Sequence, residues 1–285
     1  FMTVFLNHEI RPGLGVPRAH GADGAFVSQW TVHLNSLQMK WGEDLIRRVL
    51  TWQGGTFADT TGLTAFNRFC SGDLPVYTGF YNPQTGKGFD GLIYMNGEES
   101  GAEGRAFGHV VSGDEKGTSY ELPYLGKFSW ENSVAHPNAG DKTIVVGLDD
   151  STPGQLYVYV GDKQTTGNPV ERAGLQNGYL YGVKVPGVPL EDNGAINGDF
   201  TLEAFTRAEA AGPGTVLQNL SRARGVTEFA RPEDGHWDTK NPNVFYWVTT
   251  GATLSGRPQS ARLYKLTFDS IANPTGGTIE LVVDA

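Results

Sequence analysis

Short apolar runs, each bounded by turn-forming residues, recur along the whole of this 285-residue chain. Glycine accounts for 39 residues, about 14% of the chain against a usual ~7%. Glycine at this density disfavours long helices, because it has more backbone freedom to lose on folding, and it favours many tight turns. The pattern therefore predicts an all-β fold built from short strands.

Four strand-turn-strand units stand out, at residues 3–32, 91–111, 142–160 and 243–268. The last two share a lead-in, residues 130–137 and 232–242, with an acid a few residues before an apolar position and then a polar-Pro turn. Repetition of small antiparallel sheets around an axis is how a β-propeller limits its exposed edges. A β-sandwich also has many short strands, but the internal repeat favours a β-propeller of four-stranded antiparallel blades.

Helical periodicity is confined to three short segments, 42–50, 202–211 and 216–222, which we expect to be insertions in or between blades. The glycine- and proline-rich stretch 185–199 fits a long loop between blades as well as it fits a linker. We therefore expect residues 1–285 to form a single β-propeller domain. Both ends read as strands already under way, so we also expect the chain to be an excerpt of a longer one, cut at both ends.

The charge balance narrows the possible partners. Acidic residues number 31 and basic residues 22, a net charge of −9, and the isoelectric point is near 5.1. Nucleic acids and anionic membranes select basic surfaces, so neither is an expected partner. The sequence has no apolar run of 18 residues and predicts no membrane-spanning helix. With the single cysteine, Cys70, no internal disulfide can form.

Acidic residues fall at the ends of the first strands of three units and in both lead-ins. These residues are Glu9, Glu98, Glu99, Asp149, Asp150, Glu131 and Glu233. Equivalent strand ends of propeller blades converge at one mouth of the central channel, where carboxylates repel one another unless a cation lies among them. Calcium binds six to eight oxygen ligands and suits such a group. Each acid taken singly is equally consistent with a solvated turn residue, but the recurring set favours a metal cluster.

Cys70 and the arginines leave more than one interpretation open. A lone cysteine is commonly a small buried hydrophobic residue, whereas as a thiolate ligand it indicates a transition metal such as iron. Four arginines lie beside the acidic motifs and either balance their charge or bind an anionic substrate group: Arg11, Arg18, Arg68 and Arg231. The histidines show no zinc-hydrolase spacing, and no Gly-x-Ser-x-Gly elbow is present.

Five short motifs, in this order, resemble the PhoX-type alkaline phosphatase family of bacteria. They are Leu6-Asn7-His8-Glu9, Phe69-Cys70-Ser71-Gly72, Asn96-Gly97-Glu98-Glu99, Trp130-Glu131-Asn132 and the segment from Phe229 to Gly235. The resemblance extends over nearly the whole chain. It departs from the usual family pattern after Cys70, where Asp73-Leu74-Pro75 follows, which indicates a divergent branch.

The resemblance implies a secreted bacterial β-propeller, extracellular or periplasmic, that cleaves phosphate monoesters with a calcium and iron cluster at the channel mouth. It implies that Cys70 is an iron ligand and that Glu98, Glu131 and Glu233 bind iron or calcium. Glu9 and Glu99 are weaker calcium candidates, and Arg68 and Arg231 are the catalytic candidates. Of these two metals, calcium is the better supported by the sequence.

Two functions follow as hypotheses. The first is a metal-dependent phosphomonoesterase, an alkaline phosphatase-like hydrolase acting on small phosphate esters. The second is a non-catalytic, calcium-stabilised propeller used for binding or cell-surface structure. The acidic cluster fits both, whereas Cys70 and the arginines favour the enzyme.

Overall fold

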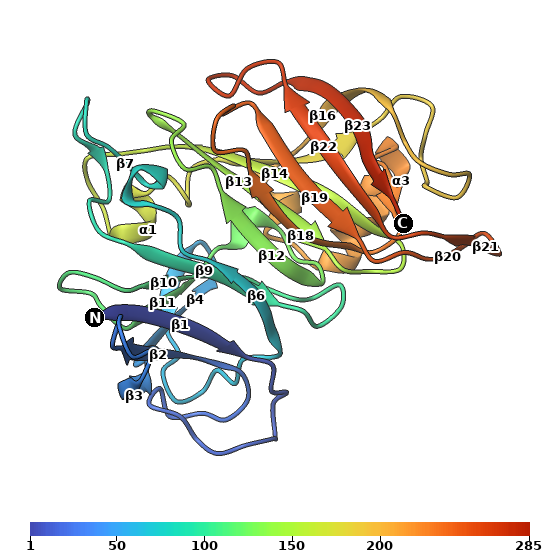
Figure 1. Ribbon diagram of the computed structural model, residues 1–285. Coiled ribbons are helices and arrows are strands. Elements are labelled where there is room, and N and C mark those ends of the chain that lie inside the picture. Colours follow the sequence, from blue (N-terminus) through green and yellow to red (C-terminus); the bar gives the residue numbers. More distant parts are fainter.

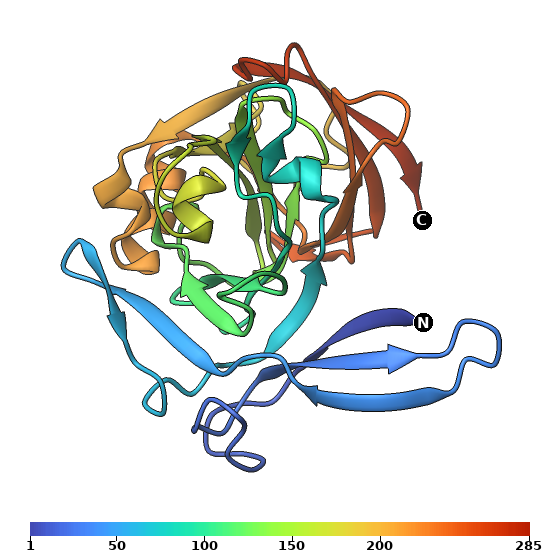
Figure 2. The ribbon, with the colours of Figure 1, turned by 90° about the vertical axis from the view of Figure 1, so that its left-hand side faces the viewer.

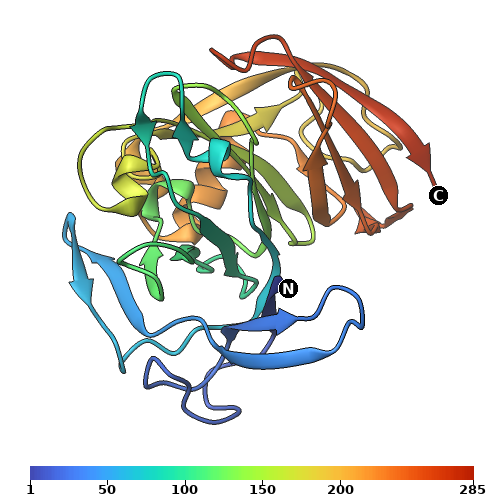
Figure 3. The same ribbon diagram turned by 60° about the vertical axis from the view of Figure 1, so that its left-hand side comes forward.

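The computed structural model describes residues 1–285, and almost all of its regular structure is β. Figure 1 shows the N-terminal sheet below a first complete blade, with two further blades above and to the right. In Figures 2 and 3 the blue, green and red parts of the chain follow one another along an arc. The predicted all-β propeller fold with four-stranded antiparallel blades is confirmed.

The N-terminal sheet has three antiparallel strands, β1 (Met2–His8), β2 (Phe26–Val32) and β3 (Met39–Asp44). The first complete blade follows it. Its strands, in spatial order, are β6 (Phe69–Asp73), β9 (Ile93–Glu98), β10 (Ala106–Val110) and β11 (Thr118–Glu121). The hairpin β4 (Arg48–Gln53) and β5 (Thr56–Asp59) extends this blade, with β4 parallel to β11. A small hairpin, β7 (Tyr81–Asn82) and β8 (Lys87–Gly88), lies in the β6–β9 connection.

The next two blades belong to one continuous sheet. One blade comprises β12 (Trp130–Ala135), β13 (Lys142–Asp149), β14 (Gly154–Asp162) and β15 (Tyr179–Lys184). The other comprises β18 (Pro232–Trp237), β19 (Val244–Thr249), β22 (Arg262–Phe268) and β23 (Gly276–Asp284). Strand β16 (Gly198–Phe205) pairs with both β15 and β23 and so joins their outer edges. Short strands β17 (Glu228–Phe229), β20 (Ala252–Leu254) and β21 (Arg257–Gln259) complete the set.

All four predicted strand-turn-strand units are antiparallel hairpins: β1–β2, β9–β10, β13–β14 and β19–β22. The shared lead-ins form β12 and β18. These two strands and β6 are the first strands of their blades, and β12 contacts both of the others. The units therefore begin at the second strand of each complete blade, and the innermost positions belong to β6, β12 and β18.

The helices are short: α1 (Pro169–Arg172), α2 (Arg207–Ala210), α3 (Gly214–Arg224), η1 (Tyr77–Gly79) and η2 (Pro123–Leu125). The predicted helix 216–222 lies within α3. The predicted helix 202–211 is half wrong, because residues up to Phe205 continue β16. Helix α2 starts only at Arg207, where Thr206 is the N-cap of a capping box with Glu209. None of these helices has the length and apolar content needed to cross a membrane.

The predicted helix at 42–50 is wrong, because these residues form the end of β3 and the start of β4. Cross-strand pairing decides the outcome: Gly42 lies opposite Trp30 of β2, and a Cβ at Gly42 would lie 2.4 Å from the Trp30 ring. Leu45 and Ile46 are buried in the core between the strands. Long-range burial therefore overrides the helical periodicity of this segment.

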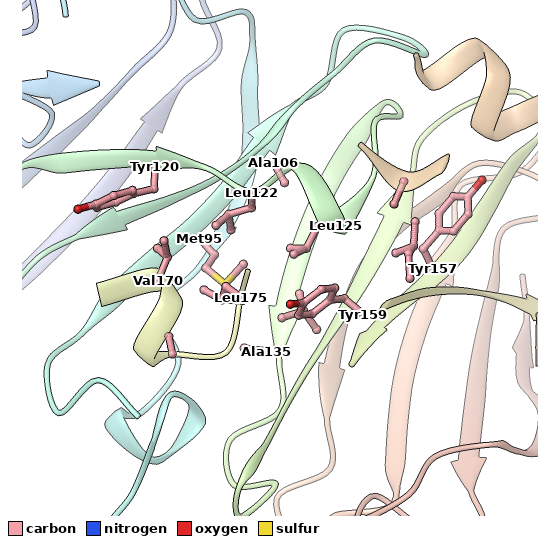
Figure 4. Packing of buried hydrophobic residues seen from close by; sticks show 14 of the residues in the cluster. Met95, Ala106, Tyr120, Leu122, Leu125, Ala135, Tyr157, Tyr159, Val170 and Leu175 are labelled. Carbon is pink, nitrogen blue, oxygen red and sulfur yellow. The ribbon is translucent and has the colours of Figure 1, made fainter. Parts of the chain in front are cut away.

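The largest core cluster, of 24 buried residues, lies between the first complete blade and the β12–β15 blade. Figure 4 shows Met95 and Leu122 from the former facing Leu125, Leu175 and Tyr159. A second cluster of 19 buried residues joins β13 and β14 to the last blade. Because apolar side chains fill the spaces between neighbouring sheets, the inner strands are held at fixed positions relative to one another.

Candidate metal centre

Each of the three inner strands contains a register irregularity at the same place, near its start. The pairing shifts between Phe69 and Gly72 in β6, between Trp130 and Asn132 in β12, and between Pro232 and Gly235 in β18. A β-bulge adds an unpaired residue and re-aims its side chain. The residues within these bulges are Cys70 and Ser71, Glu131, and Glu233 and Asp234. The bulges thus give each blade one or two donor side chains at the same mouth.

The second strand of each blade supplies another donor directly after it ends. Glu99, Asp150 and Thr250 follow β9, β13 and β19, and their backbone amides donate to the carbonyls of Arg68, Ser129 and Arg231. These three bonds, with N···O distances of 2.9, 2.9 and 3.2 Å, bring each strand end beside the bulge of its own blade. The site is therefore a threefold repeat in which the third blade carries a threonine instead of an acid.

The residue one position earlier in each acidic pair points the other way, because side chains alternate along a strand. Glu98 is 3% exposed and accepts two 2.8 Å hydrogen bonds from Arg105, plus one from the Asn67 amide. Asp149 accepts hydrogen bonds from the Ser129 amide and the Ser151 hydroxyl. Glu98 is thus placed outside the group that it was expected to join, with both carboxylate oxygens already bonded.

The thiol of Cys70 lies at the centre of the group. Its Sγ is 3.2 Å from Glu9 Oε1 and 3.1 Å from Glu131 Oε1. Donor atoms of Glu9, Cys70 and Glu99 all lie within 4.8 Å of one another, as do those of Glu99, Glu131 and Asp150. Glu99 belongs to both trios, so one continuous cluster joins β1, β6, β9, β12 and β13. We call the five residues Glu9, Cys70, Glu99, Glu131 and Asp150 the mouth cluster.

Two arginines lie against the mouth cluster and neutralise part of its charge. Arg68 donates to Glu9 at 3.2 Å and pairs with Glu99. Arg231 donates two hydrogen bonds to Asp150, from Nε at 2.9 Å and from Nη2 at 2.8 Å, and its Nη2 lies 3.0 Å from Glu233. Arg68 Nη2 and Arg231 Nη1 are left without a partner in the chain. Each guanidinium therefore keeps one terminal nitrogen free for a further acceptor.

Both arginines have left-handed backbone conformations, with φ values of +48° for Arg68 and +65° for Arg231. A non-glycine residue in this region carries a conformational cost of about 1 kcal/mol or more and persists only where its surroundings fix it. Both residues directly precede a bulged inner strand, and their carbonyls hold the strand ends that carry Glu99 and Thr250. The strained turns thus help to build the mouth.

Glu233 and Asp234 form the outer part of the site. Thr250 donates to Glu233 at 2.8 Å, and Asp234 accepts from Asn132 at 2.7 Å and from Ser71 at 3.1 Å. Ser71 Oγ also lies 3.0 Å from Glu131 Oε1, so the two carboxylates share its single hydroxyl proton, and hydrogen bonds join the β6, β12 and β18 bulges. The last blade therefore reaches the mouth cluster indirectly. Glu233 contacts Arg231 and Asp234 contacts Ser71, and these two partners contact the cluster.

Burial perturbs the titration of the central groups. It raises the pKa of Glu131 to about 7, with the negative charge of Glu233 adding to the effect. It also raises the pKa of Glu99, despite the adjacent Arg68, and that of Glu233. Burial and the neighbouring Glu131 and Glu9 carboxylates raise the pKa of the Cys70 thiol. These shifts show that, without a cation, the site disfavours its own negative charge.

The donor set fits a bound cation on one specific observation. Glu99 is 7% exposed, and its Oε2 is buried without any hydrogen-bond partner, whereas Oε1 pairs with Arg68. A buried carboxylate oxygen without a donor is costly, and a metal ion removes that cost. Four carboxylates suit a hard cation such as calcium, and the thiol suits a softer one such as iron or zinc.

The Trp130 side chain packs against the strands that carry the mouth cluster. It is 1% exposed and stacks on Phe128 with a ring separation of 4.0 Å. It also covers two glycines of the flanking strands: a Cβ would lie 2.4 Å from it at Gly97 and 2.7 Å at Gly147. Because position 97 is glycine, the strand that leads to Glu98 and Glu99 packs closely against Trp130, the residue before Glu131.

The structure brings together Glu9, Cys70, Glu99 and Glu131 from the predicted set, with Arg68 and Arg231 against them and Glu233 beside them. It adds Ser71 and Asp234, which were not candidates, and Asp150, which was counted among the acidic strand ends but was not assigned as a ligand. Asp150 carried a usable signal, because it ends a strand in the same way as Glu99. The other two follow Cys70 and Glu233, and only the bulges turn neighbouring residues toward one mouth.

No protein-family model and no curated protein matches the chain. The structure is similar to that of Pseudomonas fluorescens PhoX in complex with vanadate, a transition state analogue, with a TM-score of 0.63 and 14% sequence identity. The match covers 90% of this chain and 57% of the PhoX chain, so this chain spans little more than half of that protein. The likeness establishes a PhoX-like fold. That residues 1–285 are one incomplete domain stays a prediction.

Proposed function

We propose that this chain carries the metal centre of a phosphomonoesterase, an alkaline phosphatase-like hydrolase that acts on small phosphate esters. The observation that carries the proposal is the mouth cluster, in which a thiol and four carboxylates from five strands meet. The fold likeness to PhoX, whose structure holds vanadate, a transition state analogue, supports phosphatase-like chemistry on this fold. The extracellular or periplasmic location is part of the proposal and rests on the family resemblance.

The cations in this proposal are calcium and, at the thiol, iron. Glu99, Glu131 and Asp150 would hold a calcium ion, and Cys70 with Glu9 would hold the softer ion. When bound, such ions supply Lewis-acid stabilisation of charge on phosphoryl oxygens. Because the Cys70 thiol holds its proton tightly, binding of a metal to sulfur would release that proton.

The chain's own contribution to the reaction would be to bind and orient the phosphate. Arg68 Nη2 and Arg231 Nη1 are unpartnered, and both guanidiniums are fixed by carboxylates on their other nitrogens. A fixed guanidinium loses little side-chain freedom when it binds an oxyanion, and its bonds to phosphate are charge-assisted. The two arginines would thus hold phosphoryl oxygens and stabilise the charge that develops on them.

The test is release of phosphate from p-nitrophenyl phosphate by the purified chain after incubation with calcium and iron(II). The proposal expects metal-dependent turnover that is lost on chelation, in Cys70→Ser and in Arg231→Gln. Glu280→Gln is the control, because Glu280 lies on β23 and pairs with Lys265, away from the mouth. Absence of turnover in the metal-loaded chain would overturn the proposal.

One observation favours the second function, a calcium-stabilised propeller without turnover. Arg68 bridges Glu9 and Glu99, and Arg231 bridges Asp150 and Glu233, so the chain already neutralises part of the site. A purely structural site predicts that chelation lowers the melting temperature while no phosphate is released at any metal composition. The same two measurements therefore separate the two functions.

A further inference from the structure

A hollow of about 310 Å³ lies directly beside the mouth cluster. It contains no hydrophobic residue; its lining includes Arg11, Asn67, Arg68, Glu99, Ser100 and Ser129. Small-molecule sites occupy roughly 300–1,000 Å³ and are usually mostly apolar, so this hollow is at the small end and unusually polar. It shares Arg68 and Glu99 with the site where we place the phosphate.

Arg11 is the distinctive residue of the hollow, because its guanidinium makes no hydrogen bond or ion pair with the rest of the chain. Its backbone is nevertheless fixed. The Arg11 carbonyl accepts a hydrogen bond from the Leu14 amide, and the carbonyl of the preceding Ile10 accepts one from the Arg68 amide. The loop after β1 is thus tied to the residue before β6, which places a free arginine beside a paired one.

The Arg11 guanidinium is the unpaired charge of the hollow. Arg68 pairs with both Glu9 and Glu99, whereas Arg11 pairs with neither carboxylate. The remaining lining offers hydroxyl and amide groups from Ser100, Ser129 and Asn67, which bind polar ligands. A free guanidinium among such groups fits a carboxylate or a second phosphate, which accepts two parallel hydrogen bonds from it. An aryl or lipid group would find no hydrophobic side chain to contact here.

We propose that this hollow binds the alcohol portion of the substrate and selects alcohols that carry their own negative charge. The inference rests on the proposed phosphomonoesterase function and narrows its substrate class to small, polar, anionic phosphate esters. Arg11 would bind the second anionic group while the phosphate lies at the mouth cluster.

The test compares two esters that differ in one group: 3-phosphoglycerate, which carries a carboxylate, and glycerol 3-phosphate, which carries a hydroxymethyl group instead. In the metal-loaded chain we expect kcat/KM to be about tenfold higher for 3-phosphoglycerate, the scale of one charge-assisted hydrogen bond. In Arg11→Gln we expect that ratio to fall to about one, and in Arg11→Lys to be intermediate because charge remains without the fork. Arg257→Gln, on the β20–β21 hairpin, is the control and should leave the ratio unchanged.

A binding measurement keeps this inference distinguishable from the proposed function. Calorimetric titration of the calcium-loaded chain with phosphonoacetate and with methylphosphonate compares a ligand that carries a carboxylate with one that lacks it, without any turnover. Tighter binding of phosphonoacetate, lost in Arg11→Gln, supports the hollow even if no ester is hydrolysed. Hydrolysis of both esters with equal kcat/KM, equal binding of both phosphonates, or binding of neither would overturn the inference.

Discussion

Replacing Glu131 by glutamine should stabilise the metal-free protein at alkaline pH. Burial raises the pKa of Glu131 to about 7, against an ordinary glutamate value of ~4.3 in the unfolded chain. The native state therefore binds the proton more tightly, and the native structure loses stability as pH rises through this interval. A fully shielded group with such a shift would contribute about 3.7 kcal/mol. Because the mouth is open to water on one side, we expect about 1–2 kcal/mol.

Glutamine removes the charge and keeps an oxygen that accepts from Cys70 and Ser71, which bond to Glu131 Oε1. The assay is thermal unfolding in the presence of a chelator at pH 8 and pH 5. A gain of 1–2 kcal/mol corresponds to a rise of about 2–3 °C in Tm for a chain of this size. We expect that rise at pH 8 and little difference at pH 5, where wild-type Glu131 is already protonated in the native state.

Glu98→Gln is the matched control, because Glu98 is buried as deeply but pairs with Arg105. Removing its charge leaves a guanidinium without a counter-ion in the interior, which costs about 3 kcal/mol and lowers Tm at both pH values. The reasoning is refuted if Glu131→Gln lowers Tm at pH 8 in chelator, or if the two variants behave alike.

Three further predictions concern residues around the site. Gly97→Ala should destabilise the protein by about 1–3 kcal/mol in urea unfolding, because the new Cβ would clash with Trp130; an unchanged midpoint would mean that Trp130 does not press on this strand. Burial lowers the pKa of His109 to about 3, so its imidazole NMR signals should stay those of the neutral ring down to pH 4, and titration near pH 6.5 would contradict the burial. The Cys70 thiol should react with iodoacetamide at pH 8 much more slowly than in the unfolded chain, because thiolate is scarce; equal rates would argue against its contacts with Glu9 and Glu131.

Strand periodicity and acidic strand ends were enough to predict the blades and the region of the site. The apolar runs at 91–111, 142–160 and 243–268 form hairpins as expected, because local alternation and turn residues agree with the tertiary pairing there. The same reasoning fails at 42–50, where pairing with β2 and burial of Leu45 and Ile46 decide the conformation.

The choice between adjacent acids could not be predicted from composition or spacing. Glu98 and Glu99 are equivalent in sequence, but a one-residue difference in register sends one toward Arg105 and the other toward the mouth. The bulges that re-aim Ser71 and Asp234 leave no sequence signature either, since they arise from mismatched pairing between neighbouring strands. The left-handed backbone at Arg231 is likewise fixed by its surroundings.

Anomalous diffraction from crystals grown with calcium, recorded at long wavelength, is the most direct measurement of whether this mouth holds a cation. We predict a peak about 2.3–2.6 Å from carboxylate oxygens of Glu99, Glu131 and Asp150. Crystals that show calcium elsewhere, or none at all, with these three carboxylates held only by side chains of the protein, would contradict the account.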